Sequence, residues 1–215
     1  MKKVLVLVLT LVMSLSLTAC GNDGNFEIAK TELVDLMKSI GNDCDSTSSS
    51  IITMWNNVIN SDVDNVQMSL CYGAVTTFTS DMSKAEYDEK NGSNVYVRVW
   101  SAALAVAPEK VTGLNHNEMT DEAQEETIDI CYAYNSKVAN INSSVEKASE
   151  KLKTFKEAYS NNHSEECSLL SEWFVELKQY AEFATAPTGS YTTYTSKQKD
   201  YQDSVAKYQT KAEIL

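Results

Sequence analysis

One stretch decides the fold: residues 120–159 read TDEAQEETIDICYAYNSKVANINSSVEKASEKLKTFKEAY. Thr120 followed by Asp121 and Glu122 is typical of a helix start, where a hydroxyl caps the first turn and carboxylates favour the positive end of the helix dipole. Apolar side chains then recur every three or four positions over about four heptads, which predicts one long helix with a coiled-coil-like seam. This seam consists of Cys131, Tyr134, Val138, Ile141, Val145, Ala148, Leu152, Phe155 and Tyr159.

The same spacing recurs on both sides of that stretch and predicts three further long helices. Gly41 and the run Ser46–Ser50 weaken the middle of the first of these helices, so we expect a kink or a break there. The expected inward positions are Leu33, Met37, Ile40, Cys44, Thr47, Ile51, Met54 and Val58, then Cys167, Leu170, Phe174, Leu177, Ala181 and Ala184, and finally Tyr191, Tyr194, Gln198, Tyr201, Val205, Tyr208, Ala212 and Leu215.

Two shorter elements separate the first helix from residue 120. Ser61 and Asp62 fit the cap of a helix that ends at the turn Asn91-Gly92. Its expected inward residues are Val63, Val66, Leu70, Ala74, Phe78 and Met82. Residues 94–100 alternate like a strand, but a lone strand would have no pairing partner, so we favour a short helix over about 93–106. Residues 108–120 then form the longest loop, which we expect to be mobile.

Composition supports an all-helical fold. The 215 residues include only seven Gly and two Pro, which leaves little turn material for a many-stranded sandwich or barrel. The apolar fraction of 43% is enough for a core. We therefore predict an all-α fold, an elongated antiparallel helical bundle over residues 26–215, whose longest helices span roughly 50–60 Å.

The N-terminal residues have the pattern of an export signal. Lys2 and Lys3 precede an apolar run that is too short for a comfortable membrane span. The run ends in Leu17-Thr18-Ala19-Cys20, and in this feature the chain resembles bacterial lipoprotein precursors. The resemblance implies a signal peptide over residues 1–19 that is cleaved before Cys20, and a thioether-linked diacylglycerol on Cys20.

The same resemblance implies a location at the extracytoplasmic face of the cell membrane, with acyl chains such as palmitate as the anchor. Two or three chains hold a protein durably, since each buried CH₂ contributes about 0.8 kcal/mol. Residues 20–25 then read as a short flexible tether. The helical body is similar in style to uncharacterised lipoproteins of low-GC Gram-positive bacteria, a similarity without a diagnostic motif.

Net charge excludes one class of partner. The chain has a formal charge of −12, which becomes −14 when residues 1–19, with Lys2 and Lys3, are removed. No basic stripe is present that could neutralise phosphates, so we expect no binding to nucleic acid. The lipid is then the contact with the membrane.

Four cysteines remain after Cys20, and they allow two interpretations. An even number in an exported protein permits disulfides, and among the pairings we expect Cys71–Cys167 to be the least strained, because both are expected near the same end of the bundle. Alternatively, Cys44, Cys131 and Cys167 hold seam positions as small apolar residues.

Other candidate sites are weak. His163, Glu165, Glu166 and Cys167 include metal-ligand types, but acidic residues at a helix start are better explained by capping, and we expect no metal or other cofactor. His116 is expected to be a solvated loop residue.

Aromatic residues give two more candidates for binding. The tyrosines of the last helix are expected to pack mainly in the core, with stacking on glycans or peptides as the alternative. Tyr96 and Trp100 share a helical face next to the expected loop and are candidates for a partner contact.

Three functions remain at this stage. We favour a non-enzymatic surface module that binds or scaffolds a protein or cell-wall partner. The alternative is an accessory ligand-binding lipoprotein of a transport system, although the βα alternation of known solute-binding folds is missing. An envelope enzyme is disfavoured, because no acid–base pair stands out from the solvated helix faces.

Overall fold

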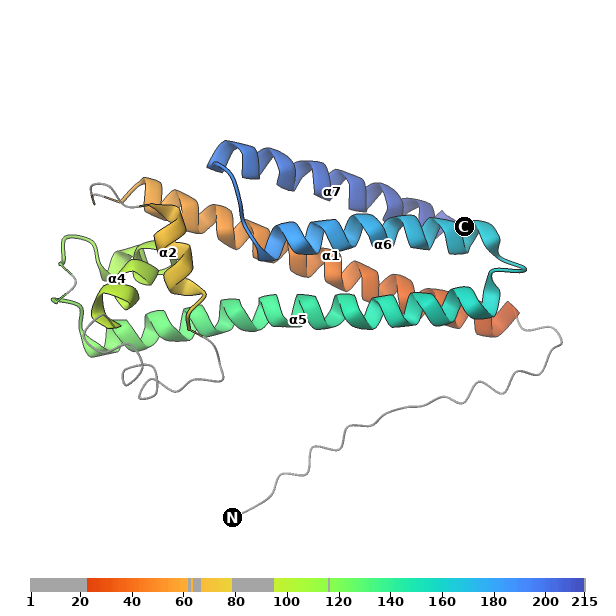
Figure 1. The fold of residues 1–215 in the computed structure, drawn as a ribbon, viewed down its shortest axis with the longest axis horizontal. Coiled ribbons are helices and arrows are strands. Elements are labelled where there is room, and N and C mark those ends of the chain that lie inside the picture. Colours follow the sequence, from red (N-terminus) through yellow and green to blue (C-terminus); the bar gives the residue numbers. More distant parts are fainter. Residues whose placement is uncertain (1–22, 62, 64–66, 79–94, 116, 215) are drawn as a thin grey trace, which may run out of the picture.

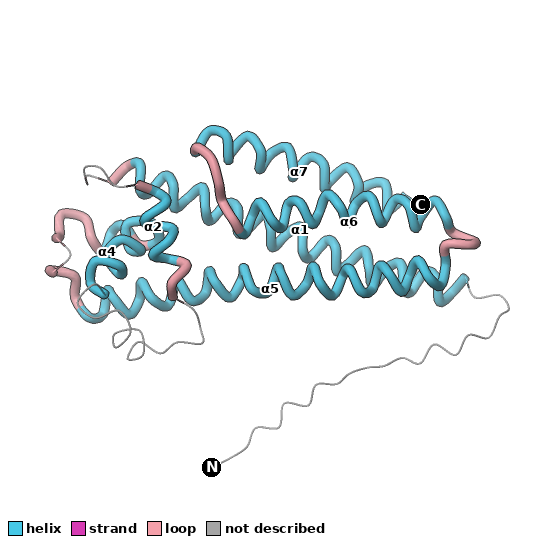
Figure 2. Tube along the Cα trace, in the orientation of Figure 1, coloured by secondary structure: helices cyan, strands magenta, loops and turns pink. Residues whose placement is uncertain are grey.

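The computed structural model describes residues 23–61, 63, 67–78, 95–115 and 117–214, and over these residues it is a bundle of packed helices without a strand (Figures 1 and 2). Two long helices, α1 (Asp23–Ile59) and α5 (Asp121–Tyr159), run antiparallel along the whole bundle. A second antiparallel pair, α6 (Ser164–Thr185) and α7 (Tyr191–Ile214), packs beside them. The predicted all-α fold is confirmed.

Shorter elements fill the end of the bundle where α1 ends and α5 begins, which we call the capped end. They are α2 (Met68–Val75), α4 (Val95–Val106) and a 3₁₀ turn, Pro108–Lys110. The opposite end, where α1 starts and α7 finishes, we call the base. Since α1 has 37 residues, the two ends lie about 55 Å apart.

The core consists of two buried clusters that share the two long helices. At the capped end, α2 and α4 pack on the last turns of α1 and the first turns of α5, around Phe78, Val99 and Ile128. Toward the base, α6 and α7 pack on the remainder of both long helices, around Leu33, Trp173 and Leu177. Neither half of the bundle therefore has a core without α1 and α5.

Helix α1 is unbroken through the residues expected to interrupt it. Gly41 faces α6 and α7, where a Cβ would lie 3.4 Å from Val205 Cγ1. In the serine run, the Ser50 hydroxyl donates to Ser46 O at 3.0 Å and that of Ser48 to Asp45 O at 3.2 Å, so these two side chains bond to carbonyls of their own helix. The helix also begins at Asp23, so the last three residues of the expected tether are helical rather than flexible.

The element after α1 differs from its prediction. Helix α2 begins at Met68 and not at Ser61, whose hydroxyl instead donates to Val58 O at the end of α1. Leu70, expected to point inward, is 65% exposed, whereas Cys71 is buried. The expected cap Asp62 and the expected turn Asn91-Gly92 lie outside the described residues, as do the inward candidates Val66 and Met82.

The described part of residues 95–120, which completes the capped end, agrees more closely with its prediction. Residues 95–106 form a helix, as favoured over a strand. The segment expected to be a mobile loop contains the 3₁₀ turn, and its Val111 and Met119 are buried in the core, so both of its ends are held. Thr120 caps α5 as predicted, since its hydroxyl accepts from Ala123 N at 3.2 Å.

Candidate functional site

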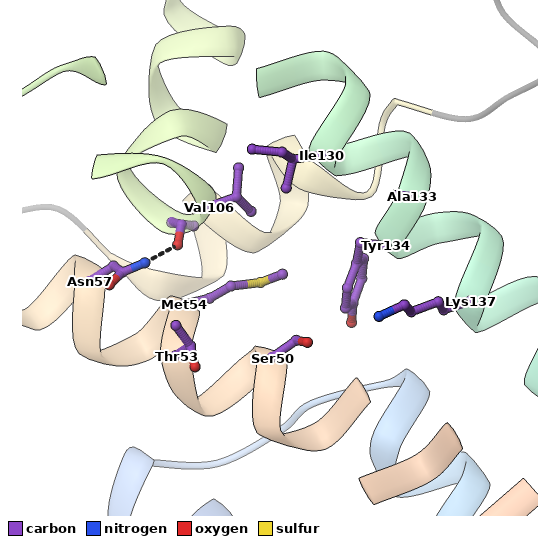
Figure 3. A pocket seen from close by; sticks show the side chains of 10 residues that line it. Ser50, Thr53, Met54, Asn57, Val106, Ile130, Ala133, Tyr134 and Lys137 are labelled. Atoms are coloured by element: carbon purple, nitrogen blue, oxygen red, sulfur yellow. Dashed lines mark hydrogen bonds between the residues drawn. The ribbon is translucent and has the colours of Figure 1, made fainter. Parts of the chain in front are cut away.

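A pocket opens between α1, α4 and α5 in the capped half of the bundle (Figure 3). It has a volume of about 270 Å³ and a mostly apolar wall. Figure 3 shows Met54 lying along it, with Val106 and Ile130 on one side and Tyr134 and Lys137 on the other. Its lining consists of Ser50, Thr53, Met54, Asn57, Ala105, Val106, Ile130, Ala133, Tyr134 and Lys137.

Small residues bring the three walls together. Ala102, Ala103 and Ala105 are fully buried, and these short side chains let α4 approach its neighbours closely. Asn57 on α1 donates its side-chain amide to Ala105 O at 2.6 Å and so fixes the end of α4 against α1. The pocket is therefore a gap between helices that hydrogen bonding and close packing hold together.

One side of the pocket is polar, and hydrogen bonds fix the direction in which its hydroxyl groups point. Tyr72 donates to Thr185 O at 3.3 Å, so in the 3.1 Å pair between the Tyr72 and Tyr134 hydroxyls we assign Tyr134 as the donor. Burial raises the pKa of both phenols, and they are neutral at physiological pH. Across the pocket on α1, the hydroxyl of Thr53 donates to Ser49 O at 3.1 Å, as that of Ser50 does to Ser46 O.

Lys137 is the one charged residue of the lining, and it forms no ion pair with any residue that the structure describes. The surrounding walls are poor in acids. Residues 46–59 contain no charged residue, α4 contains only Arg98, and residues 127–145 contain only Asp129 besides Lys137. In a chain with net charge −12, the described lining of the pocket thus carries one cation, the exposed Lys137, and no acid.

A layer of hydrogen-bonded polar side chains crosses the bundle between the two core clusters. Gln198 on α7 donates to the hydroxyls of Ser48 and Ser49 at 2.9 and 3.1 Å. The Tyr180 hydroxyl donates to Asp45 Oδ1 and lies 3.1 Å from Ser48 Oγ. Burial, followed by the bond to the Asp45 carboxylate, raises the pKa of Tyr180. Because its members satisfy one another, this layer is a structural element that joins α1, α6 and α7.

Two polar atoms beside this layer lack a partner. The hydroxyl oxygens of Thr47 and Tyr194 are buried, and neither forms a hydrogen bond within the described part of the chain. Tyr194 instead stacks on Phe183, with 4.2 Å between ring centroids. Neither residue lines the pocket.

The candidate pairing of Cys71 with Cys167 is not formed in the structure. Cys71 lies in the core cluster of the capped end and Cys167 in that of the base, so the two cannot be bridged. Along the described chain the thiols of Cys44, Cys71, Cys131 and Cys167 are free and buried. Burial raises the pKa of Cys44 and Cys131 to about 12, which fits the interpretation as small apolar seam residues.

The cluster at the start of α6 is part of the packing at the base. His163 stacks on Phe26, with ring centroids 3.6 Å apart, and its Nδ1 lies 3.4 Å from Glu166 Oε1. The pKa of Glu166 is lowered, first by a hydrogen bond from its own backbone N–H, as expected for an acid at a helix start. The described residues contain no group of three or more His, Cys, Asp or Glu that could hold a metal ion. His116 lies outside the described residues.

The two aromatic candidates for a partner contact, Tyr96 and Trp100, differ in their exposure to solvent. Tyr96 is 47% exposed and its neighbour Val97 44%. Trp100 instead packs against the core of the capped end, with its Nε1 buried and without a described hydrogen-bond partner. Of the α7 tyrosines expected in the core, Tyr194 is fully buried, while Tyr201 and Tyr208 are half-buried against the core of the base, and Tyr201 stacks on Tyr180 at 5.3 Å.

The pocket was not found from the sequence, because its lining comes from three separate elements. Ser50, Met54 and Asn57 share one helical face, but that face looks like an ordinary seam until α4 is placed on it. The lack of charge in residues 46–59 is the one signal that could have pointed to this site.

None of the helices in the described ranges combines the length and apolarity that crossing a bilayer requires. Comparison with known protein families, with curated proteins and with solved structures finds no match for this chain.

Proposed function

We propose that this chain is a lipid-anchored, extracytoplasmic helical module that binds a partner or ligand and is not an enzyme. The observation that supports this proposal best is that α1 begins at Asp23, only three residues after Cys20, the cysteine of the lipoprotein-like motif Leu17-Thr18-Ala19-Cys20. Cys20 itself lies outside the described residues, so the anchor rests on the sequence of residues 1–20. A lipid on Cys20 would tether the bundle by its base.

Anchoring by the base has a geometric consequence. The capped end would lie up to about 55 Å from the lipid, at the far end of α1. Exposed apolar side chains occur at that end, as a surface for a protein or cell-wall partner requires. They are Ile59, Leu70, Tyr96, Val97 and Leu114.

The assignment as a non-enzyme is supported by the chemistry of the pocket. Its lining includes no His, Cys, Asp or Glu among the residues described. The Ser50 hydroxyl, the most obvious nucleophile, donates to Ser46 O, and no base is hydrogen-bonded to it in the described structure.

Replacement of Cys20 tests the anchor. We expect Cys20→Ser to abolish incorporation of labelled palmitate and to move the protein from the membrane fraction to the medium. Cys71→Ser is the matched control, because it removes a buried thiol of the body and should leave both labelling and fractionation unchanged. A Cys20→Ser product that has lost residues 1–19 and still stays tightly membrane-bound would refute the proposal.

A second candidate, an accessory ligand-binding lipoprotein, is favoured by the pocket. A cleft of about 270 Å³ formed by tied helices is rigid enough to bind a small molecule without a change of fold. A thermal-shift screen of metabolites against the purified chain separates the candidates, since only the second one expects a ligand-dependent rise in Tm.

A further inference from the structure

We infer that the pocket between α1, α4 and α5 binds a small amphipathic carboxylate. The carboxylate lies at Lys137 and the apolar body lies along Met54, Val106 and Ile130. This inference rests on the ligand-binding candidate above and gives the chemical class of its ligand. It does not depend on lipid anchoring, because the pocket is made entirely of residues of the bundle.

Charge selects an anionic ligand. Lys137 has no described ion-pair partner, and no acid stands three or four residues from it on α5, where a helical neighbour would neutralise it. Asp129 is eight residues away, about 12 Å along the helix axis. The facing segment of α1 is uncharged over residues 46–59. Among the residues that the structure describes, a carboxylate at Lys137 would therefore meet a cation without an ion-pair partner and no acid in the pocket lining.

The neighbouring hydroxyls complete a site for the head group. Figure 3 shows the Lys137 ammonium and the Tyr134 hydroxyl close to one side of the pocket, facing Ser50 on α1. The Ser50 hydroxyl bonds only to a carbonyl of its own helix, and it can rotate to donate to a carboxylate oxygen at little cost. A charged head group bound by an ammonium and a hydroxyl forms the stronger, charge-assisted hydrogen bonds.

The rest of the pocket selects a short apolar body. Met54, Val106, Ile130, Ala105 and Ala133 provide a wall without free polar groups. The pocket has a volume of about 270 Å³ and is open to solvent, with Ile130, Ala133 and Lys137 exposed in its lining, so it covers one side of a short alkyl chain or a single ring. Met54 is adaptable in shape and fits either an aliphatic or an aromatic body.

Three probes with one alkyl chain and different head groups test the inference: hexanoate, hexanamide and hexylamine. The full chain, as produced by the cell and purified in detergent, is labelled with ¹³C at the methionine methyl groups and titrated with each probe by NMR. We expect hexanoate to shift the Met54 methyl signal saturably, with a Kd of about 0.1–1 mM. Hexanamide and hexylamine should bind at least about tenfold more weakly.

Variants assign the effect to the named residues. Lys137→Met keeps the apolar stem and should weaken hexanoate binding by about tenfold or more. Lys137→Arg keeps the charge and should restore binding to within a few-fold, while Lys147→Met on the same helix should change nothing. Ala133→Leu narrows the pocket and should weaken all three probes.

The outcomes are distinguishable. Hexanoate binding that Lys137→Met leaves unchanged, or hexanamide binding as tightly as hexanoate, would overturn the carboxylate inference while retaining a ligand pocket. No saturable Met54 shift with any probe would overturn the ligand-binding candidate as well. Neither result would bear on Cys20, whose role is decided by palmitate labelling and fractionation.

Discussion

Gly41 is the position at which one substitution tests the packing of the base most directly. It lies in the interior of α1, and a Cβ built on it would be 3.4 Å from Val205 Cγ1 and 3.8 Å from Leu177 Cδ1, which is ordinary van der Waals contact. Alanine is about 1 kcal/mol better than glycine in a helix interior. The added methyl group, buried between α6 and α7, contributes up to about 0.8 kcal/mol more.

We therefore expect Gly41→Ala to raise the free energy of unfolding by about 1–2 kcal/mol, or Tm by roughly 2–8 °C for a domain of this size. Thermal unfolding followed by circular dichroism at 222 nm measures the change. Gly73→Ala isolates helix propensity, because a Cβ there has no neighbour within 4 Å. Gly41→Leu should lower stability by about 1–3 kcal/mol by overpacking. A fall in Tm for Gly41→Ala would refute the assigned spacing between α1 and α7.

Three further predictions concern buried polar groups and thiols. Tyr180→Phe should lower the free energy of unfolding in urea by about 1–3 kcal/mol, because the Asp45 carboxylate loses its hydrogen-bond donor. Tyr194→Phe should change it very little, because the Tyr194 hydroxyl has no described partner. Equal losses for the two variants would contradict the described hydrogen-bond network. The contribution of the buried thiols to stability should be complete up to about pH 8 and fall above it, by about 2 kcal/mol per thiol at pH 10.5, because Cys44 and Cys131 keep protons in the folded state that the unfolded chain releases. Cys44→Ala should show a smaller fall between urea titrations at pH 8 and pH 10.5. At pH 8 the four described thiols should not react with a disulfide reagent until denaturant is added, and fast reaction of the native chain would show that they are exposed.

The long helices could be predicted because each carries many repeats of one spacing. If the predicted boundary of α5 is wrong by one residue, the buried face does not change, because nine seam positions define it. Thr120 and the acids after it mark the start in the same local way. These features are properties of the helix itself and do not depend on its neighbours.

Features that depend on neighbours could not be predicted. Trp173 and Phe174 are adjacent aromatic residues, and it is Trp173 that is fully buried, on the same face of α6 as Leu170 and Leu177. Helix α2 has apolar residues all round, so its periodicity did not identify Leu70 as its exposed side. The pairing of Cys71 with Cys167 assumed that both lie near one end of the bundle, whereas α2 with Cys71 packs at the capped end and Cys167 lies at the base.

The polar layer between the two core clusters has a consequence for how the helices are aligned lengthwise. Apolar seams repeat at every turn, so sliding α7 along α1 by one turn, about 5.4 Å, would again match apolar with apolar. Gln198 breaks this equivalence, because only one setting brings its amide to Ser48 and Ser49. Any other setting would leave a buried amide unbonded, at a cost of about 1–3 kcal/mol. One glutamine thus serves as an alignment mark that tells otherwise interchangeable turns apart.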